Sequence, residues 1–237
     1  ALSSAASDVY KRQEDNQSEE DLAEGGDTTE QNDVQNQQEI SYVQMMSKAY
    51  EKALTAKKSV VSVTKGAEQE NWNAEATGID ESVSGVIVAD NGPEILILSY
   101  ASICEDAKEW CVTFSDKSEY KASLKKKDKN SGFAIFAVDK KSLSDATWSA
   151  SSVASLGNSN LTEQGDVIFA LGNIFGYAGG SGYGIVSSSN YKEIGRDGEY
   201  SVIATDMSSA SEGTGILFNL DGEVIGMISS DIWKERG

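Results

Sequence analysis

Histidine, the residue that most enzymes use to move protons at neutral pH, does not occur anywhere in these 237 residues. Without imidazole the commonest general base and the commonest zinc ligand are both missing, and so is the usual partner of a nucleophilic serine or cysteine. The only cysteines are Cys104 and Cys111, too few for a four-thiolate metal centre or a disulfide-rich scaffold. We therefore expect no metal, no cofactor and no chemistry that depends on imidazole.

The charge balance is strongly acidic, with 20 Lys and Arg against 38 Asp and Glu and a formal net charge of −18. Binding to nucleic acid or to an anionic membrane needs clustered cations, so neither partner is expected. No run of apolar residues approaches the 18 or so that span a bilayer. The one dense basic run, at 125–129, is interpreted as a solvated loop tip, with a docking surface for an acidic partner as the alternative.

The N-terminal 39 residues divide into two stretches that are not expected to join the fold. Residues 3–13 (SSAASDVYKRQ) resemble the in-frame translation of a sequencing adapter, so 1–13 are interpreted as a non-native scar. Residues 14–39 contain ten acidic residues and no Lys or Arg, which predicts a disordered acidic linker. A tail that recruits a basic partner is the alternative, and an anchor or leader preceding the scar would be missing from this sequence.

The rest of the chain, 40–237, is predicted to be one domain rich in short strands. Apolar residues spaced by three and four predict an amphipathic helix over 40–57, at Ile40, Val43, Met46, Tyr50, Ala53 and Leu54. From residue 59 onward, short β-rich runs alternate with Gly, Asn, Asp and Ser clusters, which is typical of an all-β sandwich or barrel. The expected strands are 60–63, 83–88, 95–98, 112–114, 133–138, 167–171, 184–187, 200–204, 215–218 and 224–228.

Eight segments give this pattern a more specific meaning, because they follow one another in the order of a known set of motifs. They are 84–88 (SGVIV), 95–103 (ILILSYASI), 112–122 (VTFSDKSEYKA), 131–138 (SGFAIFAV), 165–176 (GDVIFALGNIFG), 184–188 (GIVSS), 205–206 (TD) and 213–228 (GTGILFNLDGEVIGMI). Together they resemble the HtrA-type (Deg) trypsin-like serine proteases. The resemblance implies two six-stranded antiparallel barrels, at roughly 59–140 and 150–233, with the active site in the cleft between them.

The same resemblance places the catalytic triad on three positions that cannot perform its chemistry. The family's histidine falls on Ala101, its aspartate on Gly132 and its nucleophilic serine on Gly213. The loop that would supply oxyanion-binding N–H groups is Ser211, Glu212 and Gly213, and a glutamate carboxylate there would oppose a developing anion. The chain is therefore expected to be a degenerate, catalytically inactive member of the family.

Serine and lysine side chains near these positions leave one catalytic alternative open. Within two residues of the triad positions lie Ser102, Ser131, Ser211 and Thr214. A residual hydrolase with a Ser–Lys pair would need Lys108 or one of the lysines at 125–129 as its base.

Cys104 and Cys111 are separated by six residues. In an extracytoplasmic protein they would close a small disulfide loop, which is the expectation here, and two independent buried thiols are the alternative.

The resemblance also implies where the protein works and with what. We expect an extracytoplasmic, cell-envelope protein whose full-length form carries a membrane anchor and a PDZ domain. Two roles fit an inactive member: binding unfolded or extended peptides without cutting them, or assembling with active HtrA-type paralogues as a regulatory subunit. The family's tendency to form trimers makes a homotrimer part of the second expectation.

Overall fold

The structure is a computed structural model, and it describes residues 42–66, 82–194 and 199–228. The part Ile40–Gly237 forms one compact unit. The expected scar at 1–13 and the acidic linker at 14–39 lie outside the described residues and stay predictions.

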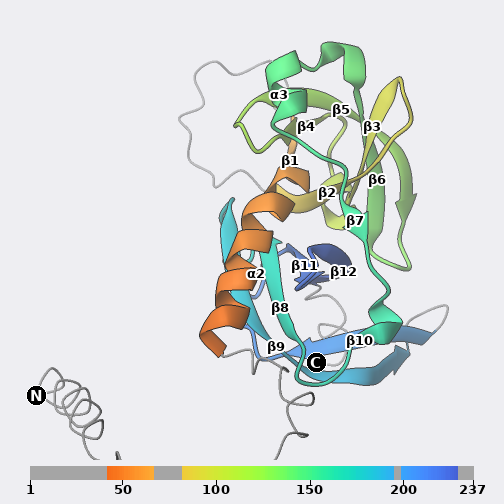
Figure 1. Ribbon diagram of the computed structural model, residues 1–237. Coiled ribbons are helices and arrows are strands. Elements are labelled where there is room, and N and C mark those ends of the chain that lie inside the picture. The colour runs from red at the N-terminus through yellow and green to blue at the C-terminus, as the bar shows by residue number, and fades with distance from the viewer. Residues whose placement is uncertain (1–41, 67–81, 195–198, 229–237) are drawn as a thin grey trace, which may run out of the picture. The chain divides into compact units, whose positions relative to one another are not determined.

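The first barrel is closed and antiparallel, and it takes the chain from β1 to β6 (Figure 1). Its strands are β1 (Val60–Lys65), β2 (Ser82–Asp90), β3 (Glu94–Tyr100), β4 (Trp110–Thr113), β5 (Glu119–Asp128) and β6 (Phe133–Asp139), in the order β1-β2-β3-β6-β5-β4. Alternate residues point inward and fill the interior, among them Val63, Ile97, Val112 and Phe136, all fully buried. This alternation confirms the barrel that the short β-rich runs predicted.

The second barrel-like part consists of one six-stranded sheet in the order β10-β9-β8-β11-β12-β7, and it is called the second barrel. Its strands are β7 (Ser155–Leu156), β8 (Val167–Gly172), β9 (Gly180–Ile194), β10 (Glu199–Thr205), β11 (Gly215–Asn219) and β12 (Glu223–Ile228). The predicted fold class is confirmed, with two differences within the described residues. The second sheet does not close on itself there, and its two-residue strand β7 runs parallel to β12 rather than antiparallel.

Helix α2 (Tyr42–Ala56) confirms the predicted N-terminal helix, but only part of its predicted stripe packs inward. The helix side chains buried in the second core, around Phe169 and Phe218, are those of Ala49, Ala53 and Ala56, and Met45 and Met46 pack partly buried against the same core. Of the predicted stripe, Met46 and Ala53 therefore face inward. Three of its other residues remain in solvent: Val43 is 71% exposed, Tyr50 57% and Leu54 55%.

The remaining helices are single turns that link strands. They are η1 (Lys57–Ser59), η2 (Ala101–Cys104), η3 (Lys140–Ser142), α3 (Asp145–Ser149) and η4 (Ser159–Leu161). Helix α3 begins after Ser144, whose side chain accepts a hydrogen bond from the Thr147 N–H and caps the helix. Within the described residues, no helix combines the length and the apolar character that crossing a membrane requires.

Candidate functional site: the junction of the two barrels

The positions expected to match the family's histidine and aspartate meet at the ends of two paired strands. Tyr100 at the end of β3 pairs with Phe133 at the start of β6, and just beyond them the Ala101 N–H donates to the Gly132 carbonyl at 2.8 Å. Ala101 is 5% exposed, whereas a Cβ on Gly132 would meet nothing within 4 Å. The structure thus brings these two positions together. One offers a methyl group and the other no side chain, so neither can move a proton.

The position expected to match the nucleophile lies in a tightly closed loop. The Ala210 N–H donates to the Ile174 carbonyl and the Gly213 N–H donates to the Ala210 carbonyl, each at 2.9 Å. A Cβ on Gly213 would lie 2.0 Å from the Ile174 carbonyl oxygen. This backbone therefore accepts no side chain at position 213, and its N–H is already committed to a carbonyl within the loop.

Tyr100 ties this loop to the first barrel. Its hydroxyl accepts a hydrogen bond from the Gly215 N–H at 3.0 Å, and it lies 2.6 Å from the Ile228 carbonyl oxygen and 2.8 Å from that of Gly215. Tyr100 precedes Ala101 and Gly215 follows Gly213 by two residues, so the three positions expected to match the triad border the same junction. The side chain is 6% exposed, which makes this a buried link between the barrels.

Ser84 on β2 is the centre of a second link, and it is completely buried. Its hydroxyl accepts from the Asn173 N–H at 2.8 Å and donates to the Thr214 carbonyl at 2.9 Å, while its own N–H donates to the Thr214 hydroxyl at 2.9 Å. Ser99 on β3 donates to the Ser84 carbonyl at 2.8 Å. These bonds fix the nucleophile-side loop to the first barrel, because a buried polar group that lost its partner would be costly.

The motif comparison did not find Ser84, Ser99 and Thr214 as a group. A signal was present, since serines at inward positions of otherwise apolar strands need hydrogen-bond partners. That Ser84 bonds both Ser99 and Thr214 could not be identified without the three-dimensional arrangement, because Thr214 is 130 residues away from Ser84 along the chain.

The side chains proposed for a residual Ser–Lys pair are engaged or exposed. Ser131 donates to a carboxylate oxygen of Asp128 at 2.9 Å, where the Asn130 N–H and this hydroxyl hold the pKa of that carboxyl below its usual value. Lys125 forms an ion pair with Glu94 at 2.6 Å. Ser102, Ser211 and Glu212 are exposed. The Ser–Lys pair stays a prediction.

The two cysteines are free thiols, so the expected disulfide is not formed in this structure. The reason lies in the strand register: Trp110 and Val112 on β4 point into the barrel, which turns Cys111 to its outer side. Cys104, at the end of η2, instead packs against the first core. Burial raises the pKa of both thiols, and the carboxylates of Glu119 and Glu109 raise that of Cys111 further, so both stay protonated at neutral pH.

Within the described ranges, no group of three or more Cys, Asp or Glu side chains is placed to hold a metal ion.

Comparison with known proteins agrees with this architecture. A family model described as "Trypsin-like peptidase domain" matches residues 83–227, which include strands of both barrels and the junction. Two solved structures share the fold: "HtrA-type protease AlgW with tripeptide", with a TM-score of 0.56, 23% identity and coverage of 75% of this chain and 53% of that one, and "Crystal structure of Deg5", with a TM-score of 0.56, 18% identity and coverage of 80% and 86%.

Curated relatives carry the name "Probable periplasmic serine endoprotease DegP-like". Those of Pseudomonas savastanoi pv. phaseolicola and of Halomonas elongata are each 34% identical over 155 residues, or 65% of this chain. The chain spans 30% of the length of these relatives. With the family model matching well over half of the sequence, this chain belongs to the trypsin-like peptidase domain family.

Proposed function

We propose that this chain is a catalytically inactive HtrA-type protein that holds segments of other proteins without cutting them. The observation that carries the proposal is the state of position 213: a glycine stands where the nucleophile is expected, in a loop with no space for a side chain. The absence of histidine from the whole sequence supports it independently of any alignment.

Activation of a nucleophile and stabilisation of the oxyanion are both disfavoured in this arrangement. A serine hydroxyl attacks a carbonyl only when a base takes its proton, and the expected base position is the methyl group of Ala101. Stabilising the tetrahedral intermediate needs free N–H donors, whereas the Gly213 N–H is bonded to the Ala210 carbonyl. With nucleophile activation and oxyanion stabilisation both disfavoured, binding without turnover is the activity we assign.

The intact contacts between the two barrels support a binding role. The polar links through Tyr100 and Ser84 hold the barrels together although the triad positions carry no catalytic groups. We place the protein outside the cytoplasm, in the cell envelope, because the curated relatives are named periplasmic. A membrane anchor and a PDZ domain in the full-length protein are part of the same proposal.

Unfolded casein provides the test. After incubation with the purified chain, we expect casein to co-elute with it on size exclusion and to remain intact on gels. Casein fragments that disappear with Ser102→Ala, Ser131→Ala or Ser211→Ala would overturn the proposal and establish the residual hydrolase. Fragments that persist with all three variants come from a contaminating protease, and the incubation is repeated after further purification until the casein result can be read.

A second arm separates binding from regulation. An active Deg-type protease is assayed on casein with and without the chain. If the chain alters the protease's rate and co-sediments with it, but does not retain casein by itself, the peptide-holding role is wrong and the chain is a regulatory subunit.

A further inference from the structure

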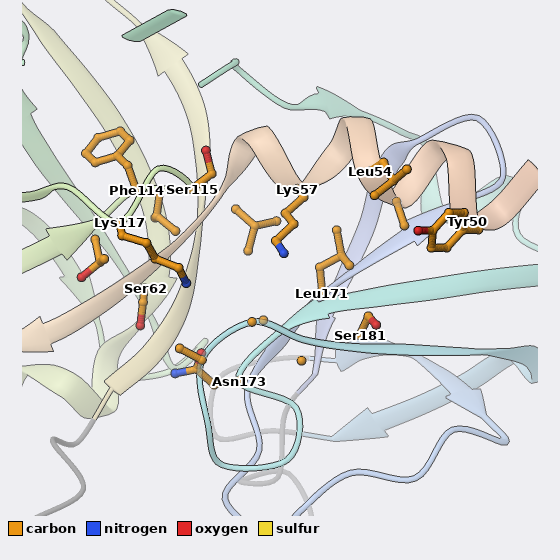
Figure 2. A pocket seen from close by; sticks show the side chains of 18 of the residues that line it. Tyr50, Leu54, Lys57, Ser62, Phe114, Ser115, Lys117, Leu171, Asn173 and Ser181 are labelled. Atoms are coloured by element: carbon orange, nitrogen blue, oxygen red, sulfur yellow. The ribbon is translucent and has the colours of Figure 1, made fainter. Parts of the chain in front are cut away.

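A groove on the α2 side of the junction, with which it shares Asn173, has an apolar and cationic lining. It lies between the C-terminal half of α2, strand β1, the β4–β5 turn at 114–118 and the segment 171–183, and encloses about 300 Å³ (Figure 2). Most of its wall is apolar: Tyr50, Ala53, Leu54, Val60, Val61, Phe114, Leu171, Ala178 and Tyr183.

The described residues give the groove positive charge only. Among them, the charged lining residues are Lys57 and Lys117, and no described Asp or Glu lines the groove, although the chain has 38 acidic and 20 basic residues. Figure 2 shows the amine ends of both lysines directed into the space between Ser62 and Leu171. The ion pairs formed within the described residues use other lysines, at positions 48, 121, 125, 140 and 192.

Lys117 is held there in a strained backbone. Its φ is +72°, in the left-handed region where glycine is the favoured residue. The turn around it is well made, with the Lys117 N–H donating to the Phe114 carbonyl at 2.9 Å and Asp116 accepting from the Ser118 N–H at 3.0 Å. A long cationic side chain in a conformation that costs stability is a feature that functional sites often contain.

A buried hydroxyl on the same wall of the groove has no hydrogen-bond partner among the described residues. Ser62 on β1 lines the groove, and its Oγ is buried without any hydrogen-bond partner in the described part of the chain. Buried polar groups are nearly always paired, so this hydroxyl is a polar group that a molecule bound in the groove, a ligand or a water, can complete.

A second hollow lies beside the groove on α2. This hollow, lined by Val43, Met46, Ser47, Tyr50 and Glu51, shares Tyr50 with the first. The two hollows together are apolar along their length, cationic at the Lys57 and Lys117 end and acidic at the Glu51 side of the other. That polarity suits an extended chain with different groups at its two ends better than a small anion.

We propose that this groove binds an acidic peptide segment, with apolar side chains against Tyr50 and Leu54 and carboxylates on Lys57 and Lys117. Apolar burial provides the contact area and the two ammonium groups fix the direction of the peptide. Binding here does not depend on whether the barrel junction can cut a substrate.

The test is fluorescence anisotropy with a labelled, end-capped peptide of two leucines followed by two glutamates. We expect Lys57→Gln and Lys117→Gly each to weaken binding about tenfold, the loss of one charge-assisted hydrogen bond. Lys58→Gln is the matched control, because Lys58 is exposed on the same short helix but does not line the groove. Lys117→Gly also relieves the backbone strain, so its thermal stability should be unchanged or raised while peptide binding falls.

Three results would overturn the proposal. The glutamine version of the peptide would bind as tightly as the glutamate version, or the two groove variants would bind like the Lys58→Gln control. The third is binding of decanoate with the same dependence on the two lysines and no binding of the peptide, which would assign the groove to a free fatty acid.

Discussion

A serine restored at position 213 is the most demanding test of the closed loop. In the variant Gly213→Ser, the new Cβ would lie 2.0 Å from the Ile174 carbonyl oxygen and 2.9 Å from its carbonyl carbon. Non-bonded heavy atoms settle at about 3.5 Å or more, so the loop would have to move by about 1 Å or more. The hydrogen bonds from Ala210 to Ile174 and from Gly213 to Ala210 stand in the way of that movement.

Overpacking of this kind costs about 2–3 kcal/mol in buried sites. For a domain of this size, that free energy lowers the melting temperature by about 4–12 °C. Thermal and urea unfolding followed by circular dichroism measure it. Gly226→Ala is the matched control, because its Cβ would meet nothing closer than Leu217 at 3.8 Å, and it should melt with the parent protein.

The triple variant Ala101→His, Gly132→Asp, Gly213→Ser extends the test to activity. We expect no casein cleavage, because the three side chains alone do not release the loop N–H from the Ala210 carbonyl. A Gly213→Ser protein that melts like the Gly226→Ala control, or a triple variant that cleaves casein, would refute the reasoning and show that the loop opens readily.

Three further predictions follow from the described contacts. Tyr100→Phe removes the hydroxyl that joins Gly215 and Ile228 and leaves buried backbone groups unpaired, so urea unfolding should show a loss of about 1–3 kcal/mol, whereas exposed Tyr177→Phe should show none. Hydrogen bonds from the Thr147 hydroxyl and the Ser118 N–H lower the pKa of Asp116 in the folded protein below its ordinary value of 3.8. The stability that Asp116 contributes is therefore complete above pH 3.8 and is lost as the pH falls through the lower folded pKa. The urea midpoint of Asp116→Asn should fall less steeply with acid than that of the parent protein, and equal slopes would refute this. Because Cys104 and Cys111 are free thiols whose pKa values are raised by burial, adding a reductant should leave the melting temperature unchanged, and a drop would show that a disulfide forms in the protein.

The strands that were predicted well are those whose burial alternates or is complete. Val83, Val86 and Ile87 on β2, or the fully buried β8, carry enough apolar residues for the pattern alone to locate them. Strand β5 is different: KASLKKKD has few apolar positions, and its extent depends on pairing with β4 and β6 rather than on its own composition. The two-residue strand β7 has no sequence signal and exists because β12 offers an edge.

The helix shows how a correctly predicted element can have a partly incorrect predicted face. Of the predicted stripe, Met46 and Ala53 pack against the second core, whereas Val43, Tyr50 and Leu54 stay exposed. An apolar spacing pattern does not say how much room a side chain has, whereas close packing against a sheet depends on the size and shape of each side chain. The exposed stripe became part of the groove that the sequence alone did not reveal.

The junction was in part predicted from the sequence and in part visible only in the structure. Motif order predicted that the triad positions fall on Ala101, Gly132 and Gly213. The structure adds that the space a side chain would need at position 213 is filled by the Ile174 carbonyl. The hydrogen bonds from Ser84 to Thr214 and from Gly215 to Tyr100 join residues more than 100 positions apart, which no local pattern encodes.

Intact-mass spectrometry after treatment with a serine-reactive fluorophosphonate tests the central claim most directly. Only a serine whose proton is removed by a nearby base reacts quickly with this reagent. We predict that the protein keeps its unmodified mass under conditions that label an active Deg-type protease completely. A stoichiometric adduct on Ser102, Ser131 or Ser211 would contradict the account and identify the chain as an enzyme.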